Sequence, residues 1–214
     1  NKKVNNMMNN LNHRGPDFRT IFKNSLGCFG FLRLSIIDLS DKSNQPFQSR
    51  DKKISIIYNG EIYNYKNLKK NYFKSTKFNS NGDGEILIHL YNKFGINFIS
   101  KIKGMFSICI IDQNINKIYL IRDRFGIKPL YYFHDKNKND LYFASEINSI
   151  LKNTNIKREL NYNETFKFFK QGLVNGTNET FFKNIFQVNK SCYLEFSKNK
   201  IIEKQYYFLE KSID

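Results

Sequence analysis

The chain has 214 residues, with 40% hydrophobic and 16% aromatic residues and a formal net charge of +16. This length and apolar content suit one domain with a full hydrophobic core, and no apolar run reaches the ~18 residues of a membrane-spanning helix. The charge would suit nucleic acid or an anionic membrane, but the lysines are scattered and no nucleic-acid-binding module is present, so we expect neither partner. The single alanine, Ala144, beside abundant Asn, Lys and Ile indicates an AT-rich coding sequence, which accounts for the surplus of lysine.

Cysteine and histidine are sparse. The three cysteines show no pairing pattern, which favours a reducing cytoplasm over a disulfide framework. The three histidines stand apart from clustered cysteines or acids, so we expect no metal site. No basic and then apolar signal segment opens the chain. We therefore expect a cytoplasmic protein.

The first half of the chain alternates strands with two helices. Its apolar patterns predict strands over residues 18–22, 26–34 and 53–58 and helices over 65–72 and 83–94. The second helix carries its apolar residues on one face and ends at Gly95, with further helical turns over 96–102. A long polar loop precedes the third strand, and Pro46 within it breaks any regular element.

The second half is dominated by hairpins. Its patterns predict strands over residues 105–111, 117–121, 130–133, 141–144, 191–196 and 200–202, and helices that begin at Ser145 and span 164–170. Ser145 is expected to cap its helix. Two groups of strands around two central helices indicate an α+β fold of two antiparallel sheets covered by helices.

The segment Asn59-Gly60-Glu61 follows an apolar strand and combines three chemistries. The side-chain amide of Asn59 and the N–H of Gly60 are two adjacent donors of the kind that a developing oxyanion requires. Glycine also lets the backbone approach a ligand closely, and the Glu61 carboxylate suits a substrate ammonium. Because Asn-Gly is a common hairpin turn, a plain turn is the alternative interpretation.

Arg33 and Asp83 could complete a site for a free α-amino acid. A guanidinium binds a carboxylate through two parallel hydrogen bonds, and Asp83 together with Glu61 could hold an ammonium. Asn59 and Gly60 would then act on a carbonyl in the amino acid's side chain. The alternatives are a surface salt bridge for Arg33 and a helix N-cap for Asp83.

Seven motifs stand along the chain in a fixed order: His13–Asp17, Arg33–Asp38, Asn44–Phe47, Tyr58–Asn64, Gly104–Phe106, Arg122–Tyr132 and Phe143–Ile147. In this set and order the chain resembles the class II glutamine amidotransferase domain of glutamine-hydrolysing asparagine synthetases. The resemblance implies one type 2 amidotransferase domain over residues 1–214. It also implies the four-layer αββα sandwich of N-terminal-nucleophile hydrolases, in which two antiparallel sheets are flanked by helices.

The resemblance assigns roles to the residues singled out above. Asn59 and Gly60 would form the oxyanion hole for the hydrolysis of L-glutamine to glutamate and ammonia. The substrate pocket would consist of Arg33 on the α-carboxylate, Glu61 and Asp83 on the α-ammonium, and the backbone of Leu34, Ser35, Ile36 and Ile37. The ammonia would pass to an activated aspartate in a C-terminal synthetase domain of the same protein.

One departure from the family concerns the nucleophile. The resemblance implies a cysteine at the mature N-terminus whose own α-amine is the base, whereas this sequence opens with Asn1. Cys28, Cys109 and Cys192 lie in strand-like segments, where a buried thiol is inert, and none has a free α-amine. We therefore expect a fragment that lacks its nucleophile. No Ser-Gly-Gly-x-Asp-Ser loop is present, so the synthetase domain, with its ATP and Mg, is expected to be missing as well, and no cofactor is expected here.

Other interpretations stay open. The ammonia acceptor could differ, as in asparagine-synthetase-like enzymes of other pathways, or the domain could be a non-catalytic glutamine-binding module. A homodimer is compatible with the resemblance. The basic loop Arg122–Pro129 could bind an anion, but a structural role is favoured. Phe31 replaces a histidine usual in the family, and we expect only a small effect on binding.

Overall fold

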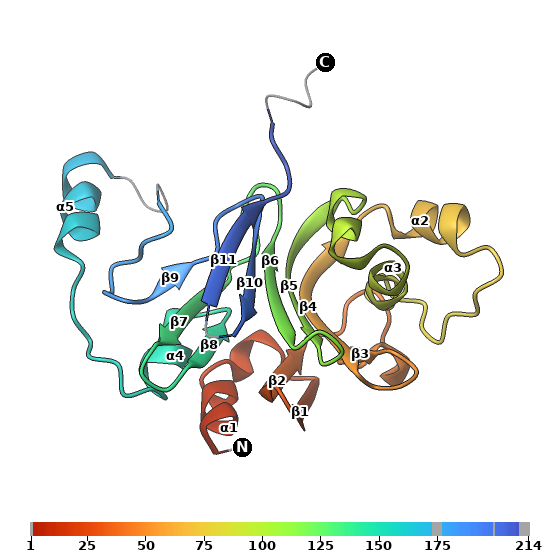
Figure 1. The fold of residues 1–214 in the computed structure, drawn as a ribbon, viewed down its shortest axis with the longest axis horizontal. Helices are drawn as coiled ribbons and strands as arrows, with labels where there is room; N and C mark the ends of the chain where they lie inside the picture. Colours follow the sequence, from red (N-terminus) through yellow and green to blue (C-terminus); the bar gives the residue numbers. More distant parts are fainter. Residues whose placement is uncertain (1, 173–176, 199, 210–214) are drawn as a thin grey trace.

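A six-stranded antiparallel sheet forms the centre of the molecule (Figure 1). The computed structural model describes residues 2–172, 177–198 and 200–209. The strand order is β11-β10-β6-β5-β4-β3, with bounds β3 Phe47–Gln48, β4 Ile54–Ile62, β5 Gly104–Asp112, β6 Lys117–Arg122, β10 Cys192–Ser197 and β11 Lys200–Gln205. Strands β4, β5 and β6 carry long apolar runs because both faces of the sheet are covered.

A second β layer covers one face of this sheet. It consists of a hairpin of β1 (Phe18–Asn24) and β2 (Gly27–Arg33), and of a three-stranded sheet in the order β8-β7-β9. The latter strands are β7 Tyr131–Asp135, β8 Asp140–Ala144 and β9 Phe186–Gln187. Phe29 and Tyr132 of this layer pack against Ile57, Cys109 and Leu120 of the central sheet.

Helices close the two outer faces. On the central sheet, α2 (Tyr65–Tyr72) and α3 (Ile86–Phe94) bury Leu68, Leu87 and Leu90 against the strands. On the second β layer, α1 (Lys2–Asn9) and α4 (Ile147–Leu151) bury Met7 and Ile150. The four-layer αββα sandwich expected from the resemblance is therefore confirmed, with its second sheet split into two parts. The remaining helix, α5 (Tyr162–Gln171), lies at the edge of the molecule (Figure 1).

Several local expectations were wrong. Helix α3 begins at Ile86, three residues later than expected, because residues 83–85 form a turn. Ser145 does not cap α4, whose N-cap is Glu146. Helix α1 and the two-residue strands β3 and β9 were not expected, since such short or polar segments carry no strong periodicity.

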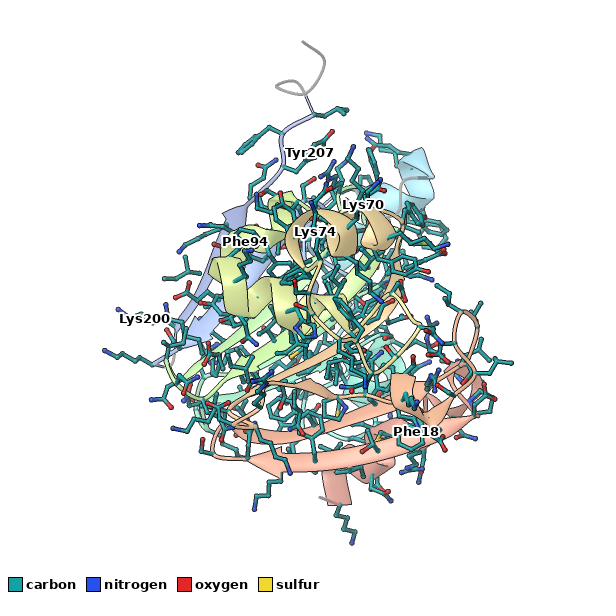
Figure 2. All side chains as sticks on the ribbon, turned by 90° about the vertical axis from the view of Figure 1, so that its right-hand side faces the viewer. Phe18, Lys70, Lys74, Phe94, Lys200 and Tyr207 are labelled. Carbon is teal, nitrogen blue, oxygen red and sulfur yellow. The ribbon has the colours of Figure 1, made fainter. Side chains whose placement is uncertain are left out.

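The basic side chains are spread over the surface. Figure 2 shows Lys70 and Lys74 projecting near α2 and Lys200 projecting from β11, on different parts of the molecule. Within the part of the chain that the structure describes, no helix is both long and apolar enough to span a membrane. The same residues contain no cluster of three or more His, Cys, Asp or Glu side chains that could hold a metal ion.

Candidate functional site

The segment Asn59-Gly60-Glu61 belongs to strand β4 and is not a turn. It pairs with β5 in the register Asn59↔Ser107, Gly60↔Phe106 and Glu61↔Met105. Gly60 has a φ of 156°, and a Cβ added there would lie 2.1 Å from the Met105 carbonyl oxygen. A side chain is therefore excluded by space and by backbone conformation. The hairpin interpretation is wrong because the glycine lets the strand continue alongside β5.

The open edge of β4 carries a row of outward-pointing N–H groups. Alternate residues of an antiparallel strand direct their N–H groups away from the paired neighbour. Phe106 uses its own N–H and C=O on Asp123, at 3.2 and 2.9 Å, so the Gly60 N–H faces the open edge. Strand β3 pairs only with residues 55 and 56 of β4 and does not reach this point.

Side-chain oxygens accept hydrogen bonds from the two N–H groups that neighbour Gly60 on that edge. The Tyr58 N–H donates to Gln45 Oε1 and the Ile62 N–H donates to Asp83 Oδ2, both at 2.7 Å. In the described ranges no side chain accepts a hydrogen bond from the Gly60 N–H. Among the described residues, the Gly60 N–H is therefore without an acceptor, whereas the Tyr58 and Ile62 N–H groups on either side of it are hydrogen-bonded.

Asn59 borders a partly open cavity of about 580 Å³ between the two β layers. Ser107 and Cys109 of β5 and Phe29 of β2 also line this space, which is mostly apolar. The cavity thus places Asn59 beside a mostly apolar space, where a hydrogen bond to a developing charge is stronger than in bulk water.

Arg33 is buried, and its hydrogen bonds go to the loop that follows it in the chain. Its guanidinium donates to the Ser40 carbonyl at 2.9 Å, to Asn44 Oδ1 at 2.7 Å and to the Asp38 carbonyl. These bonds use three of its five N–H groups and leave two. The surface salt-bridge interpretation is wrong, because every one of these acceptors is uncharged.

Asp38 and Asp17 fix the loop that follows Arg33. Asp38 accepts hydrogen bonds from the Ser40 N–H at 2.9 Å, the Ser43 hydroxyl at 2.8 Å and the Asn81 N–H at 2.9 Å. These bonds, led by those from Ser40, hold the pKa of the Asp38 carboxyl well below its usual range. Asp17 accepts from the Ser35 N–H at 2.7 Å. Both acids lie in the quoted motifs, which was the only sequence signal for them.

The apolar residues of this loop face outward. The side chains of Leu34, Ile36 and Ile37 are exposed, and Ser35 is half-buried. The backbone role expected for residues 34–37 in a pocket next to Arg33 stays a prediction.

Glu61 and Asp83 both act electrostatically on Tyr58. Asp83 is buried, and one carboxylate oxygen holds the Ile62 N–H of β4. Burial, the Asp83 carboxylate and the Glu61 carboxylate all raise the pKa of Tyr58. The N-cap interpretation of Asp83 is wrong, since α3 begins three residues later and its N-cap is Glu85.

The two halves of the expected pocket are joined indirectly. In the described residues no hydrogen bond or ion pair connects Arg33 to Glu61 or Asp83. The connection runs from the Arg33 loop through Asp38 to the Asn81 N–H, two residues before Asp83. The structure therefore places the Arg33 loop and the Asp83 loop against each other and places Asp83 at the edge of β4.

The cysteines are not arranged as nucleophiles. Cys109 is fully buried in β5, and burial raises the pKa of its thiol. Burial also raises the pKa of Cys192 to about 11. Cys28 lies within β2 and borders the cavity. All three stand inside the chain, so none has a free α-amine that could serve as its base.

The basic loop after β6 is held by its own side chains. The buried Arg122 guanidinium donates to the carbonyls of Gly126, Lys128 and Val188 and to Gln187 Oε1. The fully buried Asp123 carboxylate accepts from the N–H groups of Phe106, Phe125, Ile127 and Lys128. These bonds support the structural interpretation of residues 122–129.

Comparison with known proteins identifies what the chain is similar to. A family model described as "Glutamine amidotransferase domain" matches residues 1–207. Asparagine synthetase [glutamine-hydrolyzing] 2 of Bacillus subtilis is 41% identical over 195 residues, which is 89% of this chain and 26% of that protein. The putative asparagine synthetase [glutamine-hydrolyzing] 2 of Methanocaldococcus jannaschii is 34% identical over 98% of this chain and 44% of its own length.

A solved structure supports the fold. The glutamine phosphoribosylpyrophosphate amidotransferase from B. subtilis superposes with a TM-score of 0.67 at 18% identity, covering 96% of this chain and 46% of that one. The chain thus spans less than half the length of each of these relatives.

Proposed function

Because the chain belongs to the glutamine amidotransferase domain family, we propose that it binds L-glutamine and provides the oxyanion hole for hydrolysis of the side-chain amide. The observation that carries this proposal is the unfilled Gly60 N–H on the open edge of β4. It lies next to Asn59 and is flanked on the same edge by Asp83, which is bonded to Ile62. An amide carbonyl placed there accepts from the Gly60 N–H and the Asn59 side chain.

The rest of the substrate follows from the charges around this point. Asp83 and Glu61 take the α-ammonium, since both carboxylates act electrostatically on Tyr58 of the same strand edge. The two unused N–H groups of Arg33 take the α-carboxylate, a charge-assisted contact worth about 1.5–3 kcal/mol. The backbone of residues 34–37 lines the pocket between them.

The chemistry is acyl transfer to a thiolate. In the proposed reaction the thiolate adds to the amide carbon, the carbonyl oxygen becomes an oxyanion held by Asn59 and Gly60, and ammonia leaves with a proton from the base. Water then adds to the thioester through a second oxyanion in the same hole and releases glutamate. No cysteine at positions 28, 109 or 192 can do this with its own α-amine, because all three stand inside the chain.

The use of the ammonia is a wider proposal. The relatives at 41% and 34% identity are glutamine-hydrolysing asparagine synthetases by name. By analogy the ammonia passes to a synthetase domain that acts on aspartate in the cytoplasm, and ATP and Mg²⁺ are assigned to that domain. An enzyme with another acceptor, or a module that only binds glutamine, shares the same pocket.

Calorimetric titration tests the pocket directly. The 214-residue chain binds L-glutamine, and binding is at least ~10-fold weaker for L-norvaline, which lacks the side-chain amide, and for glutaric acid monoamide, which lacks the α-ammonium. Equal affinities for the three compounds, or no binding of L-glutamine, would contradict the proposal.

A further inference from the structure

Lys69 of α2 lies behind the loop that carries Asp83. Its Nζ is 3.4 Å from the Gly82 carbonyl oxygen, and it lies over the Phe78 ring at 4.2 Å and the Tyr65 ring at 5.3 Å from their centroids. The side chain is half-buried. The ammonium is thus held between aromatic faces, which attract a cation, and the peptide immediately before Asp83.

Three carboxylates act on this one ammonium through space. Asp38, Asp83 and Glu85 each act electrostatically on Lys69 and raise its pKa, although burial has the largest effect and lowers the pKa overall. Asp38 belongs to the Arg33 loop, whereas Asp83 and Glu85 belong to the loop before α3. The Lys69 ammonium therefore lowers the electrostatic repulsion among these carboxylates, which belong to two loops that the Asp38–Asn81 hydrogen bond joins.

We propose that Lys69 is a positioning residue for the substrate's α-amino group: it holds the Gly82–Asp83 segment so that one Asp83 oxygen stays on the Ile62 N–H while the carboxylate faces the ammonium. This proposal rests on the function proposed above. It assigns to Lys69 an indirect role, since its bonds are to the loop and not to the substrate.

The sign of the effect separates this proposal from a simple charge effect. A cation near the pocket repels the substrate ammonium, so if Lys69 acted only through space its removal would tighten glutamine binding. If Lys69 positions Asp83, its removal weakens glutamine binding. A general loss of packing would weaken every ligand alike.

The chain offers a matched control. Lys93 of α3 makes the same kinds of contact from a more exposed position: its Nζ is 3.3 Å from the Tyr72 carbonyl oxygen and 5.6 Å from the centroid of the Phe73 ring. No Asp or Glu ion pair to Lys93 exists in the described residues. Lys93→Met therefore removes an equivalent cation and carbonyl bond at a distance from the Asp83 loop.

The experiment compares Lys69→Met, Lys69→Arg and Lys93→Met in the 214-residue chain. We expect Lys69→Met to raise the Kd for L-glutamine about 5–10-fold, to leave the Kd for glutaric acid monoamide within about twofold, and Lys69→Arg to restore most of the affinity. Lys93→Met should leave both constants unchanged. Unchanged or tighter glutamine binding in Lys69→Met, or equal weakening of both ligands, would overturn the proposal.

A second readout needs no ligand. Hydrogen exchange measured by NMR should be about 5–10-fold faster at the Ile62 amide in Lys69→Met, because that amide reports the bond to Asp83. The Tyr58 amide on the same edge is held by Gln45 and should not change. If the unaltered chain binds no glutamine, the proposed function fails, and the Ile62 exchange still decides whether Lys69 positions Asp83. An unchanged Ile62 exchange rate overturns the positioning role.

Discussion

Two loops of this protein share one arrangement. In each, an arginine donates hydrogen bonds to carbonyl oxygens, and an aspartate carboxylate accepts hydrogen bonds from N–H groups. After β2, Arg33 donates to the carbonyls of Asp38 and Ser40 and to Asn44. After β6, Arg122 donates to three carbonyls and one side-chain oxygen, and Asp123 accepts from four N–H groups.

The loops differ in what they leave unused. Arg122 donates four of its five N–H groups to its own loop and to the segment before β10. Asp123 is fully buried. Arg33 donates three of its N–H groups. Asp38 of the same loop accepts a hydrogen bond from the Asn81 N–H of a second loop. The comparison teaches that a saturated Arg–Asp loop is structural, whereas a loop with spare donors next to an open strand edge can bind a ligand.

The largest effect is expected in the saturated loop. Asp123→Ala would leave four N–H groups unsatisfied, each costing about 1–3 kcal/mol when buried, so we expect a loss of about 4 kcal/mol or more in the free energy of unfolding. Urea denaturation measures it. A loss below about 1 kcal/mol in the free energy of unfolding would mean that water reaches these N–H groups and replaces the carboxylate as their acceptor.

Substitution of the two arginines separates binding from stability. Arg33→Ala should raise the Kd for L-glutamine about 10–100-fold, because it removes a charge-assisted contact of about 1.5–3 kcal/mol. Arg122→Ala should act mainly on the free energy of unfolding, with a change below about threefold in Kd for the folded protein. Calorimetry and urea denaturation on both variants check this, and the reverse pattern would contradict the distinction between the loops.

A pH effect is expected in the open loop. The pKa of Asp38 is lowered in the folded state, so its carboxylate contributes stability above the unfolded value of 3.8, and that contribution is lost as the pH falls toward the folded pKa. The stability of the unaltered protein should therefore fall more steeply below about pH 4 than that of Asp38→Asn. Carbon NMR should find that the Asp38 carboxyl titrates with a pKa below 3.8. A midpoint at or above that value would contradict the stabilisation of the loop by hydrogen bonds to the Asp38 carboxylate.

The smallest effect concerns the residue two positions before Arg33. Phe31 lines the cavity between the β layers rather than the Arg33 loop. Phe31→His should change the Kd for L-glutamine by less than about twofold, because no charge or donor of the proposed pocket is altered. A larger change in calorimetry would show that the pocket extends to this side of β2.

The sequence predicted the layers well and the local details less well. Long apolar runs such as those of β4 and β5 were correctly expected as strands, because burial on both faces leaves a continuous pattern. The strand was expected to stop at Tyr58, however, since Asn-Gly favours a turn when considered locally and only pairing with β5 keeps it extended. The early start given to α3 had a similar cause, because Asp83 looks like a cap until its bond to the Ile62 N–H is known.

For the candidate site the motifs indicated the residue types but not their contacts. Arg33, Asn59, Gly60, Glu61 and Asp83 were chosen by charge and by resemblance, and their substrate contacts stay predictions. Asp38, Gln45 and Lys69 were not chosen, because each acts on another residue's backbone. Such contacts depend on tertiary structure that no local pattern encodes.

The central claim is that the Gly60 N–H is an open donor for the glutamine side-chain carbonyl. Hydrogen exchange of the β4 amides with and without saturating L-glutamine tests it most directly. We expect the Gly60 amide to be protected about 10-fold or more on binding, while the Tyr58 and Ile62 amides, already bonded to Gln45 and Asp83, change little. An unchanged Gly60 amide in a chain saturated with glutamine would contradict the oxyanion-hole assignment.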